Sequence, residues 1–253
     1  KCDKLIVAPG NAGISSIADC AAIDIMDGSA VVAFCEANSI DFVIVGPEAP
    51  LAAGVADDLR DAGFAVFGPS AAAARLEASK AFTDGETVLP IGTAQDHKRV
   101  GDGDTGPNTG GMGAYSPAPV LTDAIATRAL DEIIRPTMNE MARRGMPYKG
   151  VLYAGLMIKN GVPRLVEYNV RFGDPECQVL MMRLGAQAFD LMHAAAEGRL
   201  AEMRVNWADD HAITVVMAAD GYPGGYEKGT NIGGLEGLPE DSSNMVFHAG
   251  TAK

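Results

Sequence analysis

The stretch that decides the fold is Leu165-Val166-Glu167-Tyr168-Asn169-Val170-Arg171-Phe172, followed by Gly173-Asp174-Pro175-Glu176. Strand side chains alternate between two faces, so Glu167, Asn169 and Arg171 share one face, whereas Val166, Tyr168, Val170 and Phe172 form an apolar face. A carboxylate and an amide oxygen suit a hard cation such as Mg²⁺, and a guanidinium beside them suits a phosphate or carboxylate. Spacing alone leaves a solvent-facing polar row as an equally good interpretation.

This strand is the second half of a predicted hairpin. Residues 151–158 and 162–172 flank Asn160-Gly161, a dipeptide favoured in type I′ turns. A helix is then expected near Asp174, which can cap it while Pro175 takes the first helical position. A binding interpretation stays open beside the capping one: a helix start can hold an anion, and Asp174 or Glu176 an ammonium group.

A second polar segment, residues 95–113, precedes the hairpin. It carries charges of both signs and six glycines, and is expected to form a long loop anchored by residues 112–115. Long loops inside compact domains are usually functional or disordered. Successive amides of such a loop can cradle oxyanions, and a mobile surface loop is the alternative.

The first eighty residues alternate predicted strands with predicted helices. The strands cover 4–8, 41–45 and 64–67, and the helices cover 29–37, 51–62 and about 70–80. This order predicts a parallel sheet with helices on both faces and ligands at the carboxyl ends of its strands. The Gly/Pro loops at these ends could equally be simple turns, and no Gly-x-Gly-x-x-Gly motif supports a dinucleotide site.

The remaining elements are predicted from residues that cap helices and from Pro and Gly, which end or interrupt them. Residues 122–144 are predicted helical, with Thr122 as N-cap, Gly145 after the end, and a kink or split at Pro136. Helical pattern after Glu176 continues to Gly198 with an interruption at Gly185. Strands are expected at 212–218 and 246–248.

Composition narrows the function classes. The 253 residues are 47% hydrophobic and 21% charged, with a net charge of −13, which is typical of a globular protein. This charge argues against a general nucleic-acid binder, although a small anion needs only a local cluster of donors. No apolar run is long enough to span a bilayer. The four cysteines and four histidines lack metal-ligand spacing, and reduced cytoplasmic thiols are the simplest interpretation.

Five motifs, taken together and in order, resemble the phosphoribosylamine–glycine ligase family of the ATP-grasp superfamily. They are residues 9–13, 46–51, 95–117, 167–176 and 221–229. The likeness covers nearly the whole chain. It implies an α/β ATP-grasp fold in three parts: an N-terminal Rossmann-like parallel-sheet domain (1–81), a central α+β ATP-grasp domain (82–203) and a partly missing β-rich C-terminal domain (204–253).

The resemblance also implies a reaction of purine biosynthesis. ATP phosphorylates the carboxylate of glycine, and the amine of 5-phosphoribosylamine attacks the acyl phosphate to give glycinamide ribonucleotide, ADP and phosphate. Such an enzyme is expected to need Mg²⁺ or Mn²⁺, to be cytoplasmic and monomeric, and to bind neither nucleic acid nor membrane.

By the family pattern, Glu167 and Asn169 are the metal ligands, and Arg171 steadies the transferred phosphoryl group. Asp174 and Asp96 are expected on the substrate side, at the glycine ammonium. Contacts to phosphates or phosphoribosylamine are expected from Gly10, Asn11, Gly13, Glu48, Pro50, Lys98, Asn108, Thr109, Gly110 and Gly111.

The chain departs from the family pattern in two ways. Many ATP-grasp enzymes place a second metal carboxylate on the preceding strand, but residues 150–156 contain no acid, which fits the glycinamide ribonucleotide branch better than the biotin carboxylase branch. An N-terminal strand, the C-terminal end and an ATP-lid subdomain between Thr83 and Asp84, with a Gly-rich loop and a lysine, are also expected but missing. A different carboxylate–amine ligase and a non-catalytic binding remnant are therefore alternatives.

Overall fold

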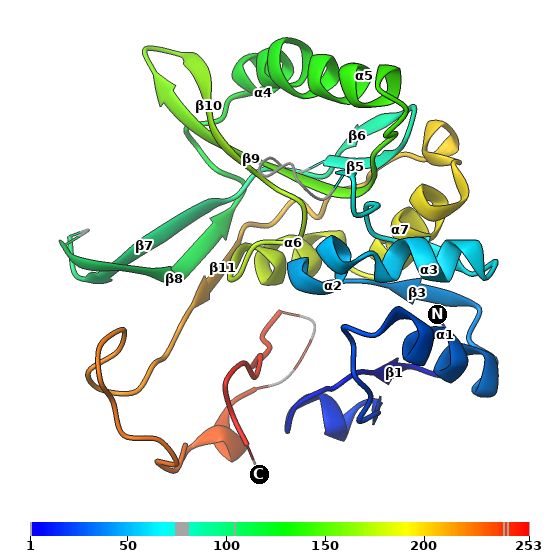
Figure 1. Ribbon diagram of the computed structural model, residues 1–253. Coiled ribbons are helices and arrows are strands. Elements are labelled where there is room, and N and C mark those ends of the chain that lie inside the picture. The colour runs from blue at the N-terminus through cyan, green and yellow to red at the C-terminus, as the bar shows by residue number, and fades with distance from the viewer. Residues whose placement is uncertain (1, 74–80, 104, 240, 242, 253) are drawn as a thin grey trace.

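The computed structural model describes residues 2–73, 81–103, 105–239, 241 and 243–252 (Figure 1). Its α-helices are α1 (Gly28–Ala37), α2 (Glu48–Ala53), α3 (Val55–Asp61), α4 (Asp123–Ala129), α5 (Arg135–Arg143), α6 (Glu176–Leu184) and α7 (Gln187–Glu197). Its strands are β1 (Ile6–Val7), β2 (Asp19–Cys20), β3 (Phe42–Ile44), β4 (Ala65–Phe67), β5 (Ala81–Asp84), β6 (Val88–Pro90), β7 (Gln95–Gly101), β8 (Thr105–Ser116), β9 (Lys149–Lys159), β10 (Val162–Asn169) and β11 (Ala212–Val215).

The N-terminal region contains two short parallel sheets. β1 pairs with β2 and β3 pairs with β4, so the predicted parallel pairing is confirmed, but the expectation of one sheet is wrong for the described residues. The helix predicted over 51–62 is split into α2 and α3, because Gly54 adopts a left-handed conformation (φ 94°) between them. The helix predicted over about 70–80 lies mostly at 74–80, outside the described residues, and residues 70–73 contain no α-helix.

A four-stranded antiparallel sheet in the order β10-β9-β5-β6 forms the centre of the molecule (Figure 1). The predicted hairpin is confirmed as β9–β10, and its turn residues Asn160 (φ 53°) and Gly161 (φ 73°) both have the positive φ that a type I′ turn requires. β10 is shorter than predicted, ending at Asn169. The predicted domain boundary after residue 81 falls inside β5.

Helices α4 and α5 cover one face of this sheet. Thr122 caps α4 by accepting a hydrogen bond from the Ile125 amide, and Gly145 follows α5 with φ 76°, both as predicted. The expected split at Pro136 is also confirmed: a π-helical turn, Leu130–Ile134, separates α4 from α5. Proline has no N–H to donate to the preceding turn, which explains why the regular hydrogen-bond ladder is interrupted there.

Two hydrophobic cores lie on either side of the sheet. One joins α1–α3 to α5 and includes Leu59, Leu152 and Val170. The other joins α7 to β4 and β5. In it, the rings of Phe67 and Phe82 pack edge to face, with 5.1 Å between their centroids. The break at Gly185 and the left-handed Gly198 that ends α7 agree with prediction.

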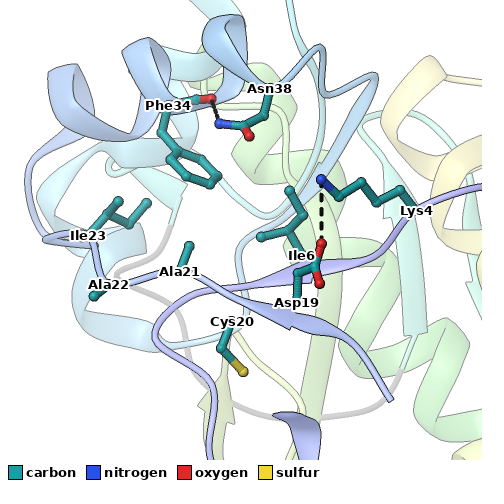
Figure 2. Close-up of a pocket in the computed structure, with 9 residues that line it drawn as sticks. All are labelled: Lys4, Ile6, Asp19, Cys20, Ala21, Ala22, Ile23, Phe34 and Asn38. Carbon is teal, nitrogen blue, oxygen red and sulfur yellow. Dashed lines mark hydrogen bonds and ion pairs between the residues drawn. The ribbon is translucent and has the colours of Figure 1, made fainter. Parts of the chain in front are cut away.

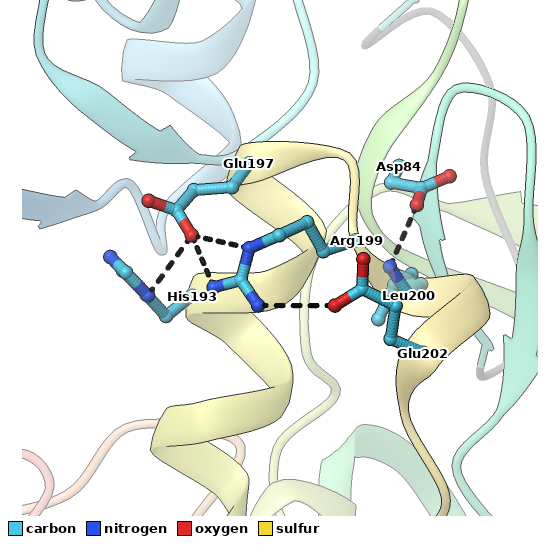
Figure 3. Close-up of polar contacts among 6 residues, drawn as sticks. All are labelled: Asp84, His193, Glu197, Arg199, Leu200 and Glu202. Atoms are coloured by element: carbon cyan, nitrogen blue, oxygen red, sulfur yellow. Dashed lines mark hydrogen bonds and ion pairs between the residues drawn. The ribbon is translucent and has the colours of Figure 1, made fainter.

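Buried Asp84 fastens the end of β5 to the segment after α7 (Figure 3). Its carboxylate accepts hydrogen bonds from the Leu200 amide at 2.9 Å and the Thr87 amide at 2.7 Å. Beside it, Glu197 is paired with Arg199, which donates from Nε at 2.8 Å and lowers the pKa of that carboxyl. The Asp84 carboxylate therefore accepts hydrogen bonds from backbone amides, and its role is structural.

A separate three-stranded sheet, β11-β8-β7, replaces the loop expected at 95–113. The loop prediction is wrong because the Gly-rich backbone satisfies its amides in an antiparallel ladder, with register shifts on both sides of Arg99. The strand predicted at 212–218 stops at Val215, and that predicted at 246–248 is not formed among the described residues, where no strand lies beside it.

Candidate active site

β10 presents the predicted metal-binding pair. Glu167 and Asn169 lie opposite Gly155 and Tyr153 of β9, and Asn169 is only 7% exposed. The register shifts between Leu165 and Glu167, which leaves Val166 65% exposed. The prediction that Val166 packs inside is therefore wrong, because a bulge adds one residue and changes which side chains face inward. Beyond the bulge, Tyr168 and Val170 pack inside as predicted.

The start of α6 differs from its prediction. The helix begins at Glu176 with Pro175, not Asp174, at the cap position, and no side chain caps it. The Asp174 carboxylate instead accepts a hydrogen bond from Gln178 Nε2 at 2.7 Å. The capping prediction for Asp174 is wrong because the helical hydrogen bonds already begin with the Cys177 amide donating to the Gly173 carbonyl.

A cluster of charged and polar side chains surrounds this helix start, and we call Asp96, Lys98, Tyr153, Glu167 and Glu176 the acidic cluster. Lys98 Nζ lies 2.5 Å from Asp96 Oδ2, whose side chain is 5% exposed. Burial lowers the pKa of Lys98, but the neighbouring carboxylates of Asp96, Glu176 and Glu167 outweigh it and raise the pKa overall. The ammonium therefore stays charged, yet it meets three carboxylates, so the cluster keeps an excess of negative charge that favours a cation.

Tyr153 is the polar group of β9 in this cluster. Burial, followed by the charge of Glu176 and a hydrogen bond donated to it, raises the pKa of the Tyr153 hydroxyl. Glu176 itself is 2% exposed. Tyr153 therefore remains a neutral donor that holds the buried carboxylate of Glu176.

Two glycines allow the parts of this site to approach each other. A Cβ at Gly111 would lie 2.4 Å from Pro175 Cδ and 2.9 Å from Asp96 Oδ1, and Gly111 has φ 145°. A Cβ at Gly173 would lie 2.0 Å from Glu176 Oε2. The β7–β8 hairpin and the start of α6 are therefore in direct contact, and neither position has room for a side chain.

An ion pair links the N-terminal region to the site. Arg171 Nε lies 3.7 Å from Glu48 Oε2 at the start of α2, which brings together two predicted residues that are far apart in sequence. Pro50, in the same helix, is buried. Its side chain therefore lies on the face of α2 that is turned away from solvent.

The other predicted residues of the hairpin lie toward its tip. Asn108 is exposed and pairs with Arg99, while the Thr109 hydroxyl donates to the Lys98 carbonyl at 2.9 Å and accepts from the Gly111 amide at 3.1 Å. Gly110 has no neighbour within 4 Å of the position of a Cβ. Thr109 therefore holds the backbone of Lys98 and of Gly111 in place within the hairpin.

The predicted N-terminal loop, Gly10–Gly13, lies apart from the acidic cluster. Asn11 Nδ2 donates to the His248 carbonyl at 2.9 Å, and Asn11 Oδ1 accepts from the Ile14 amide at 2.9 Å. Gly10 (φ 79°) packs against Cys20. No hydrogen bond or ion pair links this loop to β10 in the part of the chain that the structure describes.

A pocket of about 430 Å³ lies between β1, β2 and α1 (Figure 2). Its polar rim carries the ion pair between Lys4 Nζ and Asp19 Oδ2 at 3.4 Å, and its apolar wall includes Phe34. None of the predicted site residues lines it. The chemistry at β10 is therefore separate from this pocket.

Sequence reasoning missed two residues that touch the predicted site, Tyr153 and His248, and it named Glu176 as a possible ammonium ligand without predicting its burial. The hairpin alone could not have identified Tyr153, because a regular two-residue turn would place it opposite Tyr168, and the bulge after Leu165 shifts it opposite Asn169. The contact of His248 with Asn11 spans 237 positions and has no local signal.

The residues of β10 fit a divalent cation. A carboxylate and an amide oxygen from Glu167 and Asn169, completed by phosphate oxygens and water, make a donor set that Mg²⁺ commonly uses in ATP-dependent enzymes. Among the described residues, no group of three or more His, Cys, Asp or Glu side chains could hold a metal without such a ligand. The fit therefore depends on substrate phosphates.

Family models match the chain in order along its length. They are described as Phosphoribosylglycinamide synthetase, N domain (residues 1–77), ATP-grasp (A) domain (76–177) and C domain (212–253). The phosphoribosylamine–glycine ligase of Agrobacterium fabrum is 43% identical over 99% of this chain and 80% of its own length. The chain belongs to the phosphoribosylglycinamide synthetase family. The chloroplastic phosphoribosylamine–glycine ligase of Arabidopsis thaliana is 40% identical, over 99% of this chain and 66% of its own.

Solved structures agree with this family membership and with the predicted ATP-grasp fold. Phosphoribosylamine–glycine ligase from Thermotoga maritima matches with a TM-score of 0.54 and 33% identity, over 60% of this chain and 39% of that one. Biotin carboxylase from Campylobacter jejuni matches with a TM-score of 0.53 at 12% identity, over 74% of this chain and 61% of that one, which concerns the fold alone.

The comparison with the Agrobacterium fabrum relative also has an internal gap. It runs over 342 positions, whereas this chain has 253 residues, so at least 89 positions (342 − 253) hold no residue of this chain. Thr83 and Asp84, the predicted edges of the missing lid, are consecutive residues of β5 and pair with β9 without interruption.

In the part of the chain that the structure describes, none of the helices has the length and the hydrophobicity needed to span a membrane.

Proposed function

We propose that the chain catalyses the ATP-dependent ligation of glycine to 5-phosphoribosylamine, giving glycinamide ribonucleotide, ADP and phosphate through a glycyl phosphate. The observation that carries this proposal is the match of all three domains of one synthetase family, in order, along a single chain. The acidic cluster and Arg171 supply the charges that such a reaction needs: negative charge for a metal and an ammonium, and positive charge for a phosphoryl group.

In this proposal, Glu167 and Asn169 hold Mg²⁺ or Mn²⁺ together with the phosphates of ATP. When bound, the metal neutralises charge on those phosphates. Arg171 steadies the phosphoryl group by paired N–H donors. Asp174 and Asp96 bind the glycine ammonium; Asp96 is held beside Gly111 at its carboxylate, and Asp174 is held there at its backbone carbonyl. The residues act by positioning and charge, with no covalent enzyme intermediate.

The experiment is a phosphate-release assay on the full 253-residue chain with ATP, glycine and freshly generated phosphoribosylamine. We expect release that requires all three substrates and yields glycinamide ribonucleotide by mass spectrometry. Release with alanine or serine in place of glycine, at a similar rate, would favour a different carboxylate–amine ligase. No release with any amino acid would overturn the proposal.

A second candidate is a non-catalytic binding protein. The observation that favours it is that at least 89 aligned positions (342 − 253) hold no residue of this chain, and we infer that the expected Gly-rich lid and its lysine are among them. A chain without them is expected to bind ATP weakly or not at all. Calorimetric titration with ATP and Mg²⁺ separates the two candidates, because only the enzyme needs measurable nucleotide affinity.

The proposal also covers the location, the oligomeric state, the partners and the domain boundaries of the protein. We place the protein in the cytoplasm as a monomer that binds small molecules, without a nucleic-acid or membrane partner, and divide the chain at residues 81 and 203. Gel filtration with light scattering measures the mass, and a dimer would overturn the monomer assignment.

A further inference from the structure

His248 is a half-buried polar residue that contacts the loop at Gly10–Gly13. Its carbonyl accepts a hydrogen bond from Asn11 Nδ2 at 2.9 Å, and its ring lies so close to Gly13 that a Cβ there would be 2.5 Å from His248 Cδ2. The histidine therefore belongs to this loop in space, although it comes from the C-terminal segment. Figure 1 shows that segment, in red, coming back toward the first residues of the chain.

The loop's own amide group is already used within the chain. Asn11 donates to His248 and accepts from Ile14, so its side chain satisfies the backbone on both sides. His248 differs: Nδ1 lies 3.1 Å from the Thr251 hydroxyl, while Nε2 has no hydrogen bond to any described residue. Because Thr251 holds Nδ1, the ring is fixed and Nε2 is the atom left for a ligand.

The two segments in contact are also free of acidic residues. Residues 8–17 and 243–252 contain no Asp or Glu, in a chain that has 33 of them and a net charge of −13. An anion can therefore approach His248 without meeting a carboxylate from either segment. An imidazole N–H is a suitable donor to a phosphate oxygen, and a charge-assisted hydrogen bond of this kind is among the stronger ones.

We propose that His248 Nε2 binds the phosphate group of the phosphoribosyl substrate, with Asn11 and Thr251 as positioning residues. This inference rests on the proposed function, which supplies a substrate with one phosphate at the end opposite its reacting amine. It assigns a substrate contact to the C-terminal segment, which the β10 site does not use. It also explains why position 13 is glycine, because a side chain there would collide with the His248 ring.

The test compares two ligands and two histidines by titration calorimetry of the full chain. The ligands are glycinamide ribonucleotide and its dephosphorylated riboside. The variants are His248→Ala and, as matched control, His211→Ala, whose histidine is exposed and makes no side-chain hydrogen bond or ion pair among the described residues. We expect His248→Ala to weaken binding of the ribonucleotide roughly tenfold, the loss typical of one hydrogen bond to a charged group, and to leave the riboside within about twofold.

The outcomes separate the inference from the proposed function. Equal losses for both ligands would mean that His248 only shapes the loop, and no loss for either would mean that it does not touch the ligand; both overturn the inference. If the unmodified chain binds neither ligand, the proposed function itself is overturned. Should His248→Ala fail to fold, His248→Asn keeps a donor of smaller reach, and the same selective loss for the ribonucleotide is expected.

Discussion

Arg171 and Glu48 form an ion pair, with 3.7 Å between Nε and Oε2, that joins the end of β10 to the start of α2. The side chains are 37% and 50% exposed, so solvent screens the attraction and the pair adds at most about 1 kcal/mol to the free energy of unfolding. Its consequence is geometric: a group expected at the phosphoryl end of the reaction is oriented by a group expected at the phosphoribosylamine end.

Glu48→Gln is therefore expected to change catalysis more than stability. The melting temperature should stay within about 2 °C, since little free energy is lost. The KM for glycinamide ribonucleotide in the reverse reaction should rise severalfold, because the carboxylate is lost from the substrate side. Glu36→Gln, an exposed glutamate of α1, is the control. Unchanged kinetic constants would remove Glu48 from the site.

Glu167→Gln tests the proposed metal ligand. Charge stabilisation by a metal is worth several kcal/mol, so turnover should fall by roughly a hundredfold or more, and the Mg²⁺ concentration for half-maximal rate should rise. The exposed Glu236→Gln should behave as the unmodified chain. Normal turnover of Glu167→Gln at limiting Mg²⁺ would show that Glu167 is not a ligand.

Asp174→Asn separates substrate binding from structure. Asparagine can still accept the hydrogen bond that Gln178 donates at 2.7 Å, so the fold should be unaffected. Loss of the negative charge should raise the KM for glycine roughly tenfold, the value of a hydrogen bond to a charged group. The measurement is the glycine dependence of phosphate release. An unchanged KM would leave Asp174 as a partner of Gln178 alone.

The sequence predicted the elements whose signals are local. Asn160-Gly161 set the β9–β10 turn, Pro136 marked the break between α4 and α5, and alternation placed Glu167 and Asn169 on one side of β10. In each case, a few adjacent residues restrict the backbone enough to decide the outcome. Placing Glu167 and Asn169 on one side of the strand needed no tertiary information, and their role as metal ligands stays a prediction.

The misses depend on pairing between segments. The bulge that exposes Val166 is a matter of register against β9, which the pattern of β10 does not contain. The β7–β8 hairpin was taken for a loop because glycine and charged residues have low strand propensity, and neighbouring strands override that preference. Glu176 and Tyr153 meet only after the sheet and α6 have packed.

Gly111→Ala is expected to loosen the contact between the β7–β8 hairpin and α6. Gly111 has φ 145°, and a Cβ would lie 2.4 Å from Pro175 Cδ, so the backbones must separate. Overpacking and backbone strain of this kind typically cost about 1–3 kcal/mol of unfolding free energy.

Gly110→Ala is the matched control, since a Cβ there meets nothing within 4 Å. Denaturant unfolding of both variants should therefore show a large loss at 111 and little change at 110. Because Gly111 also lies against Asp96, Gly111→Ala should reduce ligase activity more than its loss of stability explains at temperatures where the variant is folded. Equal midpoints for the two variants would contradict the proposed close packing.

Tyr153→Phe tests the buried hydrogen bond to Glu176 through its pH dependence. Burial and the adjacent carboxylate raise the pKa of Tyr153 above the value of about 10 that an exposed tyrosine has in the unfolded chain. The group therefore contributes stability that is fully present below about pH 10 and is lost as pH rises, because the unfolded state releases its proton first. Tyr148, buried and with a raised pKa of its own, contributes in the same direction.

In Tyr153→Phe, the carboxylate of Glu176 loses its donor, and the free energy of unfolding at pH 8 should fall by about 1–3 kcal/mol. The further decline between about pH 9.5 and 11 should become shallower, since one of the three tyrosines with a raised pKa, Tyr148, Tyr153 and Tyr168, no longer titrates. Urea unfolding across this range measures both effects. Tyr226→Phe, at a site that is 44% exposed, should keep the slope of the unmodified chain. A Tyr153→Phe variant with that same slope would mean that the hydroxyl ionises as freely in the folded chain as in the unfolded one.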